Sequence, residues 1–238
     1  MSGRTAAARL IEPVNTTTAV ETSRTATRRP GRISAPPLVR RDYLIVKRFI
    51  DLVVFVVSLP FVLLLLALFA VAIRIDSPGP VVFTQLRTGQ HGRRFRMYKF
   101  RTMVQNAEEL KASLQHLNVL PLPDFKIIND PRITRLGRFL RKTSLDELPQ
   151  VINVWKGEMT LVGPRPTSFP AESYDLWHTR RLEVRPGITG LWQVKGRNEM
   201  TFDERLRLDS QYIRRMSLWL DAKIVWWTIA SVVRRTGA

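Results

Sequence analysis

Two adjacent carboxylates, Asp146 and Glu147, stand in the segment Thr143-Ser-Leu-Asp-Glu-Leu-Pro-Gln150, just after a strongly basic stretch of the chain. A carboxylate can attack a phosphoryl group as a nucleophile and form an acyl-phosphate. Attack of an anion on an anion needs charge screening, which arginine or a divalent metal ion supplies. The chain also contains an uncharged apolar run from Leu52 to Ile73. Together these features indicate chemistry that moves a phosphorylated group onto a lipid.

A structural interpretation of the two acids competes with the catalytic one. Ser144 and Glu147 fit a capping box, in which each side chain satisfies a free N–H group at the start of a helix. Pro149 counts against Ser144 as the cap, because it would be the fifth helical residue, where its missing N–H removes a hydrogen bond. With Asp146 as the cap, Pro149 falls in the first turn, where proline is tolerated. Asp146 would then lie at the positive end of a helix, which favours anions.

Two arginines stand near the acids in sequence. Arg141 precedes Asp146 by five residues, and Arg165 lies between two prolines, which stiffens its backbone. Either side chain can instead be a solvated surface residue, and the sequence leaves both interpretations open. A glycine-punctuated segment from Arg185 to Arg197 offers exposed backbone and an aromatic face suited to a nucleotide or its phosphates. It contains no P-loop or dinucleotide fingerprint.

Composition restricts the remaining possibilities. The chain has no cysteine, which excludes disulfides, thiolate metal sites and a cysteine nucleophile. Its 38 basic and 20 acidic residues give a formal charge of +18, which implies an anionic partner without choosing among nucleic acid, anionic lipid and phosphorylated substrates. Residues 1–42 lack apolar periodicity and are predicted to form a disordered basic tail. They also lack the apolar core of a signal peptide.

The apolar run from Leu52 to Ile73 is ~33 Å long as a helix, enough for a bilayer core of ~30 Å. Ser58 and Pro60 lie inside it, and the proline removes a backbone hydrogen bond and bends the helix. Basic residues flank both ends, whereas a span normally keeps its excess of Lys and Arg on the cytoplasmic side. A helix that enters, bends and returns to the same face satisfies both flanks. The residues alone leave both topologies open and slightly favour the span.

The remainder of the chain, residues 77–238, predicts an α+β domain that is mainly helical. Alternating apolar residues and glycines indicate a hairpin of short strands near residues 81–83 and 95–100. Apolar spacing predicts helices at about 108–117, 131–142, 146–157, 201–216 and 218–235. The last of these carries three tryptophans, which is typical of the membrane–water interface, although an ordinary core helix fits equally well.

Nine motifs in a fixed order carry a resemblance to a known family. They are Lys47-Arg48 with Asp51, Gly79-Pro80, Phe83 with Gln85 and Arg87, Lys99-Phe-Arg-Thr-Met103, Asp130 with Arg132-Ile-Thr134, Leu140-Arg141, Ser144 to Gln150, Gly163-Pro-Arg-Pro166 and Arg185 to Arg197. From about Tyr43 to the C-terminus the chain resembles the bacterial sugar transferases. These are monotopic phosphoglycosyl transferases that start exopolysaccharide and glycan assembly.

The resemblance implies a reaction. Asp146 is expected to attack the β-phosphate of a UDP-sugar and release UMP, after which the phosphosugar passes to undecaprenyl phosphate. Glu147 is expected to bind Mg²⁺ or assist proton transfer. The substrate-binding residues expected from the motifs are Lys99, Arg101, Arg141, Arg165, Arg185, Gln193 and Arg197. A weak likeness of Gly190-Leu-Trp-Gln193 to exopolysaccharide-priming members points to a hexose as the sugar.

The resemblance also implies a topology. Residues 43–76 would form a re-entrant membrane helix that bends at Ser58 and Pro60, and residues 77–238 a catalytic domain on the cytoplasmic face of the inner membrane. Family members often carry an adjacent Ser-Pro pair nearer the end of this helix, whereas Leu59 separates the two residues here. The bend is therefore less well defined by the motif than the site. Membrane lipid is an expected partner, and a homodimer is left open.

Two other functions remain as alternatives. A basic nucleic-acid-binding protein tethered by one membrane helix explains the charge of +18, but the basic residues are spread through turns instead of along one recognition helix. We therefore expect no nucleic-acid partner. A metal-dependent glycosyltransferase that moves the sugar without its phosphate is the third interpretation. It would release UDP, whereas phosphosugar transfer releases UMP.

Overall fold

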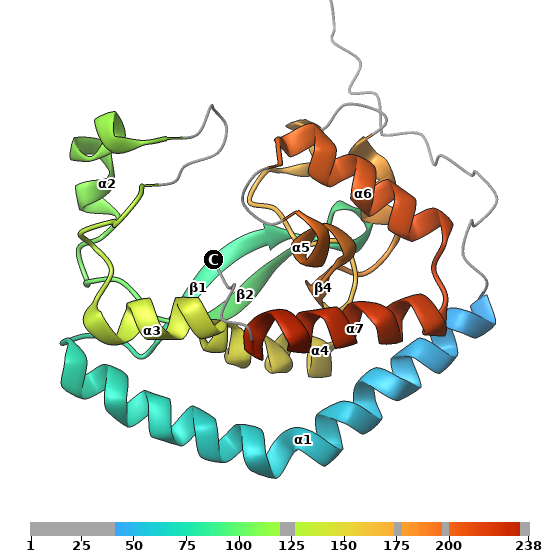
Figure 1. Ribbon diagram of the computed structural model, residues 1–238, viewed down its shortest axis with the longest axis horizontal. Coiled ribbons are helices and arrows are strands. Elements are labelled where there is room, and N and C mark those ends of the chain that lie inside the picture. The colour runs from blue at the N-terminus through green and yellow to red at the C-terminus, as the bar shows by residue number, and fades with distance from the viewer. Residues whose placement is uncertain (1–40, 120–126, 174–177, 197–199, 234–238) are drawn as a thin grey trace, which may run out of the picture. The chain divides into compact units, whose positions relative to one another are not determined.

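The computed structural model describes residues 41–119, 127–173, 178–196 and 200–233 (Figure 1). The predicted disordered tail therefore lies outside the described residues, apart from Arg41 and Asp42. Helices predominate in the described part. They are α1 (Arg41–Asp76), α2 (Glu109–Ser113), α3 (Arg135–Thr143), α4 (Val151–Lys156), α5 (Leu191–Lys195), α6 (Phe202–Arg214) and α7 (Leu218–Val233). Short 3₁₀ segments lie between the helices and strands: η1 (Gln90–Gly92), η2 (Gln115–Leu117), η3 (Leu145–Gln150), η4 (Ala171–Ser173) and η5 (His178–Glu183).

Two small sheets complete the architecture. Strands β1 (Val82–Thr88) and β2 (Arg94–Phe100) pair antiparallel in the register Val82↔Phe100 to Thr88↔Arg94. This hairpin confirms the sequence prediction, as does the mainly helical α+β character. Strands β3 (Thr160–Val162) and β4 (Gly187–Thr189) pair in parallel and were not predicted. Each has only three residues, which is too short for a periodic pattern to reveal.

Helix α1 is one uninterrupted helix that bends partway along (Figure 1), with Pro60 inside it. The Ser58 hydroxyl donates to the carbonyl of Phe55 at 3.2 Å. Pro60 has no N–H for the carbonyl four residues earlier, which belongs to Val56. Ser58 therefore bonds the neighbouring carbonyl, and not the one that the proline leaves free. Figure 1 places both halves of α1 along the same domain.

Three apolar clusters hold the elements together. One joins β3, α5, α6 and α7 through Val162, Val184, Leu191, Tyr212, Ile213 and Ile224. Another packs β2 on α4 through Phe95, Met97, Val154 and Met159. The third joins the end of α1 to β2 and α3 through Ile73, Phe100 and Leu140. The hairpin is thus packed between α1, α3 and α4, and it forms the support on which the acidic segment η3 lies.

The predicted helix from residue 146 to residue 157 is instead a 3₁₀ turn followed by a short α-helix. Pro149 lies inside η3, and α4 begins only at Val151. Proline lacks an N–H, and its ring disfavours the α conformation of the residue before it. The helix nevertheless ends at Gly157 as predicted, where a φ of 77° suits glycine.

Both capping interpretations of the acidic segment are wrong. Ser144 adopts a left-handed conformation with φ 58° at the end of α3, and its side chain makes no capping hydrogen bond. The N-cap position of α4 belongs to Gln150, so Asp146 is not a helix cap either. Because neither acid is needed to cap a helix, a structural role in capping does not account for the pair.

Candidate active site

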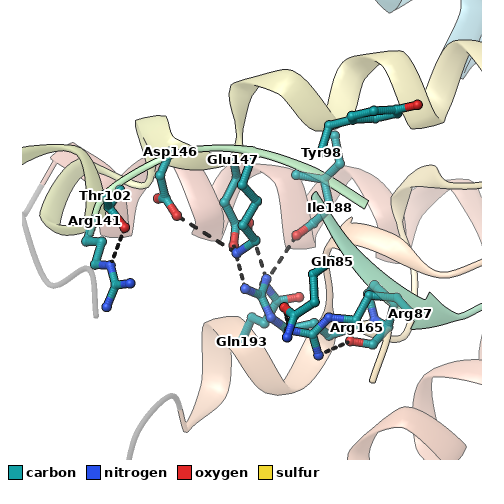
Figure 2. A network of polar contacts seen from close by, with 12 residues as sticks. Gln85, Arg87, Tyr98, Thr102, Arg141, Asp146, Glu147, Arg165, Ile188 and Gln193 are labelled. Carbon is teal, nitrogen blue, oxygen red and sulfur yellow. Dashed lines mark hydrogen bonds and ion pairs between the residues drawn. The ribbon is translucent and has the colours of Figure 1, made fainter. Parts of the chain in front are cut away.

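Asp146 and Glu147 both belong to η3 (Figure 2), and both lie near Lys99 of β2. The Lys99 ammonium nitrogen lies 2.8 Å from Oε1 of Glu147 and 3.8 Å from Oδ2 of Asp146. The Asp146 side chain is 13% exposed and that of Glu147 is 14% exposed. One lysine therefore serves two neighbouring carboxylates that are largely removed from water.

Arg165 completes the contacts of Glu147. Its Nη2 donates to Oε1 of Glu147, and its Nη1 donates to Oε2 at 3.2 Å, which is the bidentate pairing typical of arginine and carboxylate. Burial alone favours the neutral form of Glu147, but the charges of Arg165 and Lys99 outweigh it and hold the pKa of Glu147 well below its usual range. Glu147 is therefore a fixed anion.

Asp146 has a different environment. Burial raises the pKa of Asp146, the charge of Lys99 opposes the rise, and the neighbouring Glu147 carboxylate adds to it. Within the described part of the chain, no hydrogen bond is donated to its carboxylate, and Lys99 at 3.8 Å is its ion-pair partner. A carboxylate whose charge is poorly satisfied and whose oxygens are not engaged is suited to nucleophilic attack. Asp146 therefore has the environment of a reactive group, and Glu147 has that of a fixed anion.

Arg141 approaches the same region from the last turn of α3. Its Nε donates to the Thr102 hydroxyl at 2.8 Å (Figure 2). Helix α3 itself packs directly on Thr102, since a Cβ atom added to Gly137 would lie 2.1 Å from the Thr102 carbonyl oxygen. Burial lowers the pKa of Arg141, and the charge of Asp146 opposes this shift. Within the described residues, most N–H groups of the Arg141 guanidinium donate no hydrogen bond, so they can bind an added anion.

The other predicted binding residues are placed differently. Gln193 in α5 donates to the carbonyl of Ile188 in β4 at 3.2 Å. Arg101 turns away from the acids, and its Nη2 donates to the backbone carbonyl and the hydroxyl of Ser77, just after α1. Arg185 makes no ion pair with the two acids among the described residues, and its charge acts on Arg48 in α1. Arg197 lies outside the described residues.

Two residues that were not predicted hold the backbone around Arg165. Arg181 in η5 donates to the Arg165 carbonyl and pairs with Asp209 of α6 at 2.8 Å. Arg87 in β1 donates to the Pro166 carbonyl at 3.5 Å. Arg87 belongs to a motif of the resemblance, which was a usable signal. Arg181 belongs to none, and only the fold reveals that this arginine is buried.

The two acids can also supply ligands for a divalent cation that takes few of its ligands from the protein. No cluster of three acidic or histidine side chains occurs in the described ranges. Oε1 of Glu147 accepts two hydrogen bonds and Oε2 accepts one, so this carboxylate keeps about one of its four lone-pair sites. Mg²⁺ is commonly bound by one or two carboxylates, with water and substrate phosphates as its other ligands. One free site on Glu147 and the oxygens of Asp146 match that pattern.

Comparison with known proteins supplies the family. The model of the bacterial sugar transferase family matches residues 42–235. The chain is 48% identical, over 83% of its length, to the galactosyl transferase CpsE of Streptococcus agalactiae, and this match covers 44% of that protein. It is 48% identical over 67% of its length to the undecaprenyl-phosphate galactose phosphotransferase of Salmonella typhimurium, of which 35% is covered.

A shorter relative matches over most of both chains. The exopolysaccharide production protein ExoY of Rhizobium meliloti is 39% identical over 75% of this chain and 80% of its own length. The chain spans less than half of the two longer relatives. The match to the family model includes the acidic segment and the basic residues around it. The chain therefore belongs to the bacterial sugar transferase family.

Proposed function

We propose that this protein transfers a sugar-1-phosphate from a UDP-sugar to undecaprenyl phosphate as the first membrane step of exopolysaccharide or glycan assembly. Relatives carry names of this kind, among them an undecaprenyl-phosphate galactose phosphotransferase and an undecaprenyl-phosphate glucose phosphotransferase. The observation that carries the proposal is the unequal environment of the two acids. Glu147 is fixed by two cations, whereas Asp146 is buried, weakly paired and beside Lys99.

In the proposed reaction an oxygen of Asp146 forms a bond to the β-phosphorus of the UDP-sugar. The bond from that phosphorus to the oxygen bridging the two phosphates breaks, and UMP leaves with the bridging oxygen. Lys99 and Arg141 lower the repulsion between the carboxylate and the diphosphate. A phosphate oxygen of undecaprenyl phosphate then attacks the same phosphorus, which frees Asp146 and yields the lipid diphosphate sugar.

Glu147 and Arg165 organise this site in the proposal. Glu147 orients Lys99, whose ammonium nitrogen lies between the two acids. Mg²⁺, when bound at the remaining lone-pair site of Glu147 and the oxygens of Asp146, would neutralise charge on the diphosphate and on the departing UMP. The nucleic-acid-binding alternative has no support in the family assignment. The released nucleotide separates the remaining two: UMP for phosphosugar transfer, UDP for sugar transfer.

The proposal includes a membrane location. Helix α1 is long and apolar enough to cross a bilayer, and only 6% of its most apolar window is buried in protein. Its early residue Lys47 contacts Asp221, and its later residue Phe69 packs on Phe100 with ring centroids 6.1 Å apart. These residues are 22 positions apart, or ~33 Å along a straight helix. A helix crossing the bilayer would separate them by its hydrocarbon core, so contacts with one domain support a re-entrant helix.

We expect both ends of α1 to face the cytoplasm. Because the chain has no cysteine, Arg41→Cys and Gln90→Cys each introduce a single thiol that an impermeant reagent can label. If the helix is re-entrant, the reagent labels neither thiol in intact cells and both thiols in inverted membrane vesicles. The cysteine-free parent is the control for background labelling. Labelling of the Arg41→Cys thiol from outside, with the Gln90→Cys thiol protected, would establish a span instead.

A further inference from the structure

The first turns of α1 contact three separate elements of the domain through polar side chains. Lys47 pairs with Asp221 of α7 at 2.5 Å. Arg48 donates to the carbonyls of Val154 and Trp155, at the end of α4. Asp51 reaches β3. These three α1 residues lie within five positions, so about one helical turn connects the apolar helix with α7, α4 and β3.

Asp51 contacts β3, the strand that precedes Arg165 in the chain. It is 3% exposed, its Oδ2 accepts from the Thr160 hydroxyl at 2.6 Å and its Oδ1 accepts from the Leu161 N–H at 3.2 Å. Both oxygens are thus used, and both bonds hold the start of β3. Within the described residues Asp51 has no ion-pair partner, so its hydrogen bonds are its means of stabilisation.

Between β3 and Arg165 the backbone has little freedom. The N–H of Gly163 donates to the Thr189 carbonyl at 2.8 Å, and the carbonyl of Pro164 accepts from the Gly187 N–H at 2.9 Å. A Cβ atom added to Gly163 would lie 2.6 Å from the Arg185 carbonyl oxygen. A shift of β3 therefore has to displace the following segment, and with it the guanidinium that pairs with Glu147.

We propose that Asp51 is a positioning residue for the transfer reaction, acting through Thr160 and β3 on the placement of Arg165 against Glu147. This inference rests on the proposed function of the site. It makes the membrane helix part of the catalytic apparatus, because the residue that sets β3 belongs to α1. Asp51 itself does not touch the two acids in this account.

The first test compares two substitutions in the full chain, assayed in membranes with a UDP-sugar and undecaprenyl phosphate. Asp51→Ala removes both hydrogen bonds and is expected to lower kcat by about tenfold or more. Asp51→Asn is expected to keep activity within about twofold, because its amide oxygen can accept from the Leu161 N–H and its NH₂ can donate to the Thr160 hydroxyl. Val53→Ala, at a half-exposed position of α1, is the matched control and should leave kcat unchanged. Equal activity of the unsubstituted chain and Asp51→Ala would overturn the proposal.

A double-mutant cycle with Arg165 tests whether the role of Asp51 is merely structural. If Asp51 acts through Arg165, then Asp51→Ala should lower kcat by less than about twofold in the Arg165→Ala background. A fully multiplicative loss would show that Asp51 acts independently and would overturn the inference. If Asp51→Ala does not accumulate, Thr160→Val removes one of the two hydrogen bonds with little change in shape, and the same criterion applies to it.

The outcomes also separate this inference from the function on which it rests. If the unsubstituted chain releases no UMP, the proposed function fails and the inference fails with it. If the unsubstituted chain releases UMP and the cycle is multiplicative, only the role of Asp51 fails. An active parent, a restored Asp51→Asn variant and a non-multiplicative cycle together support the inference.

Discussion

Asp146→Asn is expected to abolish sugar-phosphate transfer without damaging the fold. A neutral amide cannot form the acyl-phosphate, and attack by water or lipid phosphate without it should be far slower. The substitution should also leave stability within about 1 kcal/mol, or raise it slightly. Stability is expected to be kept because the pKa of Asp146 is raised in the folded protein, so the charged carboxylate weakens folding at neutral pH. Turnover and thermal unfolding in detergent measure the two effects.

The neighbouring acid supplies the control for stability. The pKa of Glu147 is lowered, so its charge stabilises the fold above the pKa of the unfolded chain, and this stability is lost as the pH falls. Glu147→Gln should therefore lower the free energy of unfolding by about 1–3 kcal/mol. Retention of more than a few per cent of transferase activity by Asp146→Asn would remove Asp146 as the nucleophile.

Arg165→Ala is expected to have the next largest effect, a loss of kcat of about 10²–10³-fold. Arg165 contacts both oxygens of Glu147, and without it Lys99 is the ion-pair partner that the described residues leave to two buried carboxylates. Lys99 would then be drawn fully to the acids, which reduces its use for an incoming phosphate. Single-turnover kinetics with a UDP-sugar measure the loss.

Arg165→Lys separates charge from geometry. Lysine keeps the positive charge but loses the two-pronged pairing, so it should recover only part of the activity. Because Arg165 acts through Glu147, combining Arg165→Ala with Glu147→Gln should lower kcat by much less than the product of the single losses. Full activity of Arg165→Ala would contradict the role given to this pair.

The sequence was sufficient to predict the elements that have a clear apolar periodicity or are bounded by glycine or proline. The hairpin, the long apolar helix and the helices at the C-terminus all lie where apolar spacing placed them. Local patterns were insufficient where tertiary contacts decide the structure. The β3–β4 pair joins segments about 27 residues apart, whose glycines allow close approach of the two backbones.

The features of the candidate site also divide into those that the sequence predicted and those that it did not. Lys99, Asp146, Glu147 and Arg165 were found through motifs, and the structure brings them together. Motif membership alone did not give the direction of a side chain, and Arg101 turns toward Ser77 because Gly79 leaves room there for its guanidinium. The contact of Arg181 with the Arg165 carbonyl depends on a fold that no local pattern encodes.

The fate of the β-phosphorus shows whether the sugar phosphate passes through Asp146. The full chain in membranes is given a UDP-sugar with a radioactive β-phosphorus, first without and then with undecaprenyl phosphate. We predict that the label first becomes bound to the protein, with release of unlabelled UMP, and then moves to the lipid. Asp146→Asn should show neither step. Label that leaves the enzyme as UDP, with none bound to the protein or the lipid, would contradict transfer of a sugar phosphate through Asp146.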